Sequence, residues 1–450
     1  MKKQEPLIQV GILSASEIHF VLNGSYKASN NRQYSGKKIA IYRKGYILFD
    51  GDILENLSFE PTADNSSFDL KNVVIGIGFH WQRIENQRFN GSLKFIVEGG
   101  KLTAVNLINV EKYLTSVISS EMSATASEEL LKAHAVISRS WLLHPILNPP
   151  VGTGRNLSVK DDIRIGCDLS LQNSQRNIKW YERDTHKNFD VCADDHCQRY
   201  QGITRASTLA VEAAIEATRG EVLMYENKIC DARFSKSCGG ASETFENCWA
   251  PEHYPYLTKV IDNPTAPEGF KQDLTVEANA DKWIRQSPEA FCNTADKKVL
   301  AQVLNNYDQE TTDFYRWKVE YTQQEISELL TRRLGVDFGE IIDLVPVKRG
   351  ESGRIIELKI VGTKQTVIVG KELEIRKWLS NSHLYSSAFV IDKSRITEGI
   401  PQHFTLTGAG WGHGVGLCQI GAAVMGEKGY KYDEILLHYF KGAELKKIYQ

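Results

Sequence analysis

Cysteine is scarce in this chain, neither sign of charge is in excess, and long apolar runs are missing. The 450 residues include 8 cysteines, too few for the fold to require a disulfide scaffold. Lysine and arginine number 54 against 56 for aspartate and glutamate, so no overall field favours nucleic acid or an anionic membrane surface. No run of about 18 apolar residues occurs, and we see no export signal. Any partner must therefore be inferred from a local site.

The N-terminal part of the chain predicts β-structure. Short apolar runs alternate with turn pairs such as Asn23-Gly24 and Asn90-Gly91, which are typical of hairpins. The runs are Leu7 to Leu13, Ile18 to Leu22, Ile39 to Phe49, Val73 to Phe79 and Leu93 to Val97. We therefore expect a β-rich N-terminal region over residues 1–108.

The remainder, residues 109–450, predicts a mixture of helices and strands. Helices are expected over Val110 to Ser120 and Ser127 to His144, with Ser127 as the N-cap. Polar stretches near 145–185 and 265–340 indicate insertions. Further helices are expected at Ser207 to Arg219, Gln324 to Leu334 and Asp433 to Phe440, and strands at Ile341 to Val347, Ile355 to Val361 and Gln365 to Val369. Because strands and helices are segregated, the predicted class is α+β, with a central helical lobe and a mixed α/β C-terminal region.

Glu121 lies in the short break between the first two predicted helices. A carboxylate presented to a cleft from such a connection can be partly desolvated, which favours its protonated form and suits a general acid. An ordinary loop glutamate is the simpler alternative.

Two cations share the side of the second helix that faces away from its apolar stripe. At about 100° per residue the stripe comprises Leu130, His134, Ile137 and Trp141, and Lys132 and Arg139 fall opposite it. Periodicity alone therefore places both cations on an exposed face.

His186, Cys192 and Cys197 lie in one short segment. Two thiolates and an imidazole are ligands that zinc prefers, and they leave a position for water or another side chain, with His196 as the less expected fourth ligand. Free buried cysteines, or a disulfide between Cys192 and Cys197, are the alternatives.

Glycine occupies every second position from Gly408 to Gly416. In an extended chain this places glycines on one face and Trp411 and His413 on the other, and a bare face implies that something approaches the backbone closely. Trp411 suits a sugar platform and His413 a hydroxyl partner, whereas tight core packing is the structural alternative.

Lys236 and Ser237 could suggest an acyl-transfer nucleophile, but no other residue supports it.

These separated stretches resemble the SpoIID/LytB family, named after stage II sporulation protein D and an amidase enhancer. The Ser-Glu-Met sequence at Glu121 looks like the end of one family helix, and the segment with Lys132 and Arg139 looks like the next. The resemblance covers residues 90–145, 186–262 and 345–447 in preserved order. Its later motifs are Glu216 to Gly220, the Ser-x-Gly-Gly run with Ser237, Gly239 and Gly240, and Gly410 to Gly416 followed by Gln419.

The resemblance implies that Glu121 is the acid/base of a lytic transglycosylase, with Lys132 and Arg139 in the active-site cleft. It also implies a zinc ion in a structural or substrate-positioning role, held by His186, Cys192 and Cys197. The residues expected to bind substrate are Ser237, Gly239, Gly240, Trp411, His413 and Gln419. The chain departs from the family pattern in two places: Cys238 stands where serine is more usual, and Cys418-Gln419-Ile420 replaces the common Ser-Gln-Trp.

The expected activity is non-hydrolytic cleavage of peptidoglycan between N-acetylmuramic acid and N-acetylglucosamine, in the cell envelope. The expected partners are glycan strands, preferably stripped of stem peptides, and an amidase. Two alternatives stay open. A hydrolase would need a second carboxylate facing Glu121, such as Glu243 or Asp195. A non-catalytic wall-binding module would instead activate an amidase.

Overall fold

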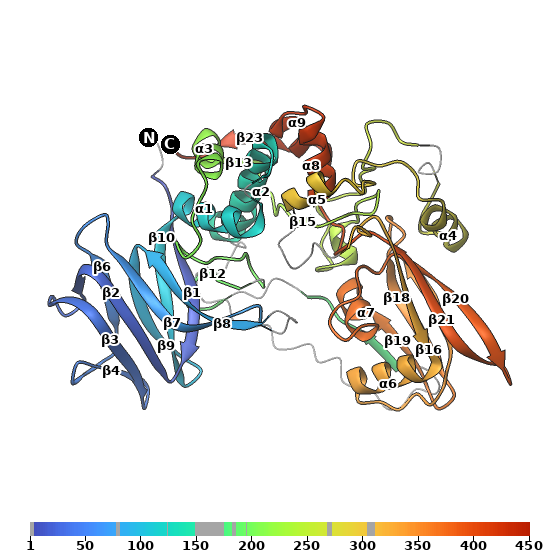
Figure 1. Cartoon of the computed structure of the whole chain (residues 1–450), viewed down its shortest axis with the longest axis horizontal. Helices are drawn as coiled ribbons and strands as arrows, with labels where there is room; N and C mark the ends of the chain where they lie inside the picture. Colours follow the sequence, from blue (N-terminus) through green and yellow to red (C-terminus); the bar gives the residue numbers. More distant parts are fainter. Residues whose placement is uncertain are drawn as a thin grey trace. The chain divides into compact units, whose positions relative to one another are not determined.

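The computed structural model describes residues 4–77, 82–123, 125–148, 175–181, 186–194, 196–267, 272–303 and 311–450 (Figure 1). Two compact units divide the chain. Unit 1 comprises Met1–Pro149, Thr185–Val222 and Leu445–Gln450, and unit 2 comprises Pro150–Asp184 and Leu223–Glu444. The boundary expected at residue 108 does not separate these units, because the helices that follow it pack in the same unit as the N-terminal strands.

Unit 1 is built on a sheet of eleven strands within the described residues. Its order is β12-β1-β10-β9-β6-β2-β3-β4-β5, and β7 pairs with β2 and with β8. The strands are β1 (Leu7–Ala15), β2 (Glu17–Ala28), β3 (Gln33–Arg43), β4 (Tyr46–Phe49), β5 (Asp52–Leu54), β6 (Leu57–Pro61), β7 (Ser67–Ile75), β8 (Arg83–Asn90), β9 (Ser92–Glu98), β10 (Lys101–Asn109) and β12 (Val191–Cys192).

Alternating aromatic side chains fill one face of this sheet. The Phe20 ring lies 5.4 Å from that of Phe59 and 5.1 Å from that of Phe95, and all three are buried. The predicted β-rich region is thus confirmed. The apolar run Ile39 to Phe49 forms two strands, because the chain turns at Lys44 and Gly45, both with positive φ. The predicted strand end at Phe79 lies outside the described residues.

Among its described residues, unit 1 also contains three helices: α1 (Val110–Glu121), α2 (Glu128–Leu147) and α3 (Leu209–Ala217). The Ser127 side chain accepts a hydrogen bond from the Leu130 N–H, which confirms the predicted cap. The predicted stripe is confirmed too, since its four members are at most 6% exposed. The exposed face predicted opposite is wrong for Arg139, which is 0% exposed, because neighbouring segments cover α2 on that side as well.

In the part of the chain that the structure describes, unit 2 holds the remaining helices and sheets ordered β11-β19-β18-β17, β16-β21-β20 and β15-β22. A further sheet has the order β14-β13-β23. Its helices are α4 (Glu277–Gln286), α5 (Lys297–Val303), α6 (Gln323–Leu334), α7 (Glu372–Trp378), α8 (Gln419–Glu427) and α9 (Tyr432–Tyr439), with a 3-10 turn at Phe245–Asn247. Its strands are β11 (Gln175–Ile178), β14 (Lys228–Ile229), β15 (Phe234–Ser235), β16 (Arg316–Thr322), β17 (Ile341–Arg349), β18 (Ile355–Gly362), β19 (Thr366–Gly370), β20 (Phe389–Thr397), β21 (Ile400–Ala409) and β22 (Leu417–Cys418). Strands β13 (Glu221–Tyr225) and β23 (Glu444–Lys447) carry the chain between the units.

The α+β class is confirmed, and part of the stretch 265–340, where we expected an insertion, contributes to the core of unit 2. Strand β16 from this stretch pairs along its whole length with β21, and its Trp317 is 4% exposed in the core of unit 2. Most of the other expected insertion, 145–185, lies outside the described residues. Among the helices described, none is long and apolar enough to cross a membrane.

Candidate functional site

Glu121 is the last residue of α1, and its side chain is half-buried. Its Oε1 atom accepts a hydrogen bond of 3.4 Å from the backbone N–H of Arg199. Within the described part of the chain, no cation forms an ion pair with this carboxylate. The carboxylate is therefore oriented by a neutral backbone donor.

The segment that supplies this donor is fixed to both long helices of unit 1. Gln201 N–H donates to the Ser116 hydroxyl of α1 at 3.1 Å. The Gln198 side chain accepts from the Tyr113 hydroxyl at 3.2 Å and donates to the Ser138 carbonyl of α2 at 3.3 Å. Bonds on both sides of Arg199 thus hold its N–H in place.

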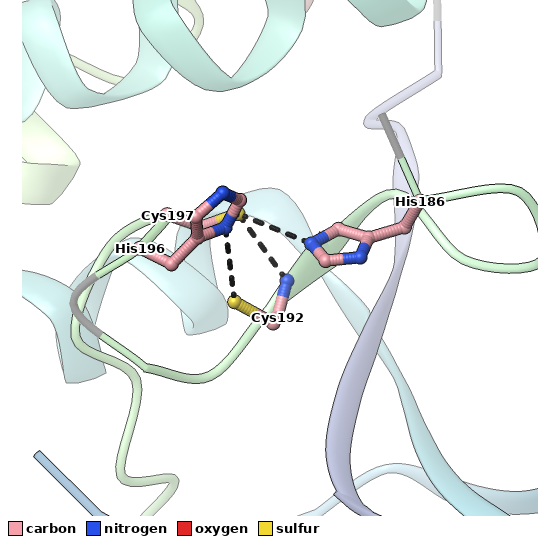
Figure 2. Close-up of side chains that lie close together, drawn as sticks. All are labelled: His186, Cys192, His196 and Cys197. Atoms are coloured by element: carbon pink, nitrogen blue, oxygen red, sulfur yellow. Dashed lines mark hydrogen bonds between the residues drawn. The ribbon is translucent and has the colours of Figure 1, made fainter. Parts of the chain in front are cut away.

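His186, Cys192, His196 and Cys197 form a group, hereafter the His/Cys cluster, whose potential ligand atoms all lie within 4.8 Å of one another. Figure 2 shows the two histidine rings approaching the two sulfur atoms from different sides. The structure thus brings together the three predicted ligands and adds His196, which was expected to be the less probable ligand. This group could hold a metal ion.

The spacing in the His/Cys cluster fits tetrahedral coordination. Cys197 Sγ lies 3.5 Å from His186 Nε2 and 3.5 Å from His196 Nδ1, and Cys192 Sγ lies 3.7 Å from His196 Nδ1. Bonds of about 2.3 Å to sulfur and about 2.0 Å to nitrogen at tetrahedral angles separate such atoms by about 3.5 Å. Hydrogen bonds from Cys197 and then from the two histidines lower the pKa of the Cys192 thiol to about 2, despite burial, so this site favours a thiolate.

Arg139 belongs to a buried ion pair inside unit 1. Its Nε and Nη2 atoms donate to the Glu111 carboxylate at 3.1 and 2.6 Å, and Nη1 donates to the Glu221 carbonyl at 2.9 Å. Glu111 Oε1 also accepts from Gly220 N–H and from the Tyr449 hydroxyl. Every guanidinium nitrogen is thus committed, and the arrangement gives Arg139 a structural role in place of the exposed position that periodicity predicted.

Lys132 is less exposed than periodicity predicted, because only 16% of its side chain is accessible. Its Nζ lies 2.5 Å from Glu128 and 3.5 Å from Glu129 in the first turn of the same helix. The hydrogen bond to Glu128 outweighs burial and raises the pKa of Lys132, so the ammonium stays charged. Its proposed place in a substrate cleft remains a prediction.

The glycine-rich segment of unit 2 is not the extended strand that alternation predicted. Strand β21 ends at Ala409, and Gly410, Gly412, Gly414 and Gly416 all have positive φ, between 76° and 98°. The predicted close approach to the backbone is present, but it comes from the protein itself. A Cβ on Gly414 would lie 2.3 Å from the Arg354 guanidinium, and one on Gly416 would lie 2.0 Å from the Arg233 carbonyl.

Trp411 joins this segment to the Ser-x-Gly-Gly run. Backbone hydrogen bonds of 2.8 and 3.0 Å connect Trp411 and Ser237 in both directions. The indole is half-buried between the rings of Phe314 and Tyr385, at centroid distances of 4.6 and 4.2 Å. Gly239 packs against Gly410 so closely that a Cβ there would lie 2.6 Å from the Gly410 nitrogen. Of the predicted binding residues, the structure therefore joins Ser237, Gly239 and Trp411.

His413 is held by backbone groups. Its Nδ1 accepts from Val415 N–H at 3.0 Å, and the Phe234 backbone is a further hydrogen-bond partner of the ring. Burial, followed by the charge of Arg233, lowers the pKa of His413 well below its usual value. The ring is thus neutral and engaged by the protein, which favours the structural interpretation over a sugar-hydroxyl partner. Gln419 is 3% exposed at the start of α8.

Glu243, one candidate for the second carboxylate of a hydrolase, is 0% exposed and saturated with hydrogen bonds. Oε1 accepts from the N–H groups of Thr244 and Glu351 and from the Asn247 amide, and Oε2 accepts from the N–H and hydroxyl of Ser352. These bonds assign Glu243 a structural role. The other candidate, Asp195, lies outside the described residues.

Sequence reasoning missed one group. Cys238, Asp262, Cys292 and Cys418 converge in the interior of unit 2, with their ligand atoms within 4.8 Å of one another, so this group too could hold a metal. The four residues come from distant parts of the chain, so their separation in the sequence does not resemble a metal-binding motif. The only signal was the presence of cysteine at Cys238 and Cys418, the two departures from the family pattern.

Comparison with known proteins connects the Glu121 region to one family. Residues 98–225, which carry Glu121 and the His/Cys cluster, match the family model for stage II sporulation protein, SpoIID, and residues 243–416 match a domain of unknown function, DUF8618. Stage II sporulation protein D of Bacillus amyloliquefaciens is 26% identical over 342 residues, covering 76% of this chain and 75% of that protein. Its Bacillus subtilis counterpart is 22% identical over 342 residues, or 76% of each chain. The amidase enhancer of Bacillus subtilis is 25% identical over 249 residues, covering 52% of this chain and 32% of that protein. Over residues 98–225 the chain is therefore similar to the SpoIID family.

Proposed function

We propose that this protein cleaves peptidoglycan glycan strands as a lytic transglycosylase, with Glu121 as both acid and base. The observation that carries the proposal is the state of the Glu121 carboxylate, which is half-buried, oriented by the Arg199 N–H and unpaired with any described cation. A carboxyl group that must both donate and accept a proton cannot be held in one protonation state by a neighbouring charge. Glu111, by contrast, is paired with Arg139.

The chemistry needs one carboxyl group. Protonated Glu121 donates its proton to the glycosidic oxygen as the bond to C1 of N-acetylmuramic acid breaks. The resulting carboxylate then accepts the proton of the C6 hydroxyl on the same sugar, whose oxygen closes on C1. This nucleophile is intramolecular, so no water and no second carboxylate are required. The commitment of Glu243 to structural hydrogen bonds supports this route over hydrolysis.

We propose that the His/Cys cluster binds zinc and positions Glu121. Four protein ligands of the nitrogen and sulfur type leave no open position, which is typical of a structural zinc site. Cys197 precedes Arg199 by two residues, so a zinc ion would stiffen the segment that donates to Glu121.

We propose a role in substrate binding for Lys132 in unit 1 and for the segments with Ser237, Gly239, Gly240, Trp411 and Gln419 in unit 2.

The relative named amidase enhancer favours a second candidate, a wall-binding protein that activates an amidase without cutting glycan. Both candidates imply a location in the cell envelope. Purified protein on isolated cell-wall sacculi separates them, because only the enzyme releases soluble fragments in the absence of an amidase. Glu121→Gln should abolish release. Glu212→Gln, an exposed position on α3 of the same unit, is the matched control and should leave release unchanged. Release by Glu121→Gln at the wild-type rate would reject the proposed role of Glu121.

A further inference from the structure

The four residues that sequence reasoning missed form a fully buried group of potential metal ligands, here called the buried thiol cluster. Cys238 is 1% exposed, and Asp262, Cys292 and Cys418 are 0% exposed. The residues lie outside the SpoIID match at 98–225, and they are not part of the site proposed for the acid/base.

The sulfur atoms have the spacing of metal ligands. Cys238 Sγ lies 3.8 Å from Cys292 Sγ, and both thiols are free. Two sulfurs bonded to zinc at about 2.3 Å with tetrahedral angles lie about 3.8 Å apart, whereas a disulfide requires about 2.0 Å. The three thiols and the carboxylate supply four donors, which is the full set for a structural zinc site.

The cluster also has an outer shell that orients its donors. The Tyr439 hydroxyl donates to Asp262 Oδ1 at 2.6 Å, and Cys292 N–H donates to Oδ2 at 2.8 Å. Cys238 N–H donates to Cys418 Sγ at 3.2 Å. Hydrogen bonds of this kind, which fix ligands and stabilise their ionised forms, are typical of metal sites.

Asp262 provides independent support. A carboxylate with 0% exposure is costly unless a cation compensates its charge, and within the described residues no cationic side chain pairs with Asp262. A metal ion would supply this charge. Three thiolates and one carboxylate carry four negative charges, of which a divalent cation neutralises two. Two guanidinium groups flank the cluster, because Arg354 donates to the Cys238 carbonyl at 3.3 Å and Arg316 donates to the Gly239 carbonyl at 2.9 Å.

We propose that Cys238, Asp262, Cys292 and Cys418 bind a second metal ion, a soft divalent cation such as zinc, in the interior of unit 2. The site joins four segments that only tertiary structure brings together. Strand β15, just before Cys238, pairs with β22, which ends at Cys418, and Asp262 N–H donates to the Gly240 carbonyl. A metal here would therefore brace the Ser237–Gly240 run and the start of α8.

Metal analysis of protein purified without chelator tests this proposal separately from the His/Cys cluster. Wild-type protein should contain about two zinc ions per chain, and Cys292→Ser and Cys192→Ser should each contain about one. Cys230→Ser, a buried cysteine of unit 2 outside both clusters, is the control and should retain both ions. Loss of zinc in Cys192→Ser alone would overturn the second site and leave the first intact.

X-ray absorption of the wild-type protein keeps the proposal testable if Cys292→Ser does not fold. Two occupied sites give about two and a half sulfur ligands per zinc, whereas the His/Cys cluster alone gives about two. Mass spectrometry of the unreduced protein completes the test. A disulfide between Cys238 and Cys292 would overturn the proposal.

Discussion

The backbone N–H of Arg199 donates a hydrogen bond of 3.4 Å to Oε1 of Glu121. Arg199 follows Cys197 by two residues, and the bonds of Gln198 and Gln201 to α1 and α2 hold the intervening chain. The His/Cys cluster and the N–H that orients the proposed acid/base thus belong to one short, braced segment. Loss of order at the cluster should reach Glu121 through this hydrogen bond.

Removal of His196 tests both the fourth ligand and this coupling. We expect His196→Ala to weaken zinc binding at least about tenfold, because it opens a four-ligand site. We also expect faster hydrogen exchange at the Arg199 amide and slower glycan cleavage. Competition with a colorimetric chelator measures the affinity, and mass spectrometry measures the exchange. An unchanged affinity for zinc would show that His196 is not a ligand and would leave His186, Cys192 and Cys197 as the ligand set.

The two cations of α2 should behave differently. Arg139→Ala leaves the Glu111 carboxylate buried without its partner, and breaking such a pair costs about 3–5 kcal/mol of unfolding free energy. Lys132→Ala should cost about 1 kcal/mol or less, because its ion pairs are partly solvated, and it should slow cleavage if Lys132 contacts substrate. Urea denaturation of both variants gives the comparison. Equal stability losses would contradict the structural assignment of Arg139.

Two half-buried histidines of unit 2 should make stability depend on pH. Burial lowers the pKa of His383 and of His438 to about 4, below the ordinary value of about 6.5. The unfolded chain therefore binds these protons first, so the free energy of unfolding should fall as the pH drops from about 6.5 towards 4. His438→Gln should reduce this slope in urea titrations at successive pH values. An identical slope in wild type and variant would show that His438 does not contribute.

Local signals predicted much of unit 1. The cap at Ser127 and the apolar stripe of α2 depend on residues only a few positions apart, and both are confirmed. Such patterns give the angle of a side chain around a helix but not what packs against it. Arg139 shows the limit, because its environment includes Glu111, Glu221 and Tyr449 from distant parts of the chain.

The two candidate metal sites also differ in whether a local sequence pattern could predict them. His186, Cys192 and Cys197 share one segment, so their spacing predicted the His/Cys cluster. The buried thiol cluster needs a tertiary fold to bring Cys238 to Cys292, and no spacing could predict it. The alternation from Gly408 to Gly416 predicted close packing, but the positive φ values show that it serves tight turns of the backbone.

The central claim is that Glu121 directs an intramolecular displacement at the muramic acid, and the product tests it most directly. Purified glycan strands should be digested with wild-type protein, with Glu121→Gln and with the Glu212→Gln control, and the new ends should be weighed by mass spectrometry. The account predicts 1,6-anhydro ends, lighter than reducing ends by one water, from wild type and control, and no new ends from Glu121→Gln. Products with only reducing ends, or cleavage that survives Glu121→Gln, would contradict it.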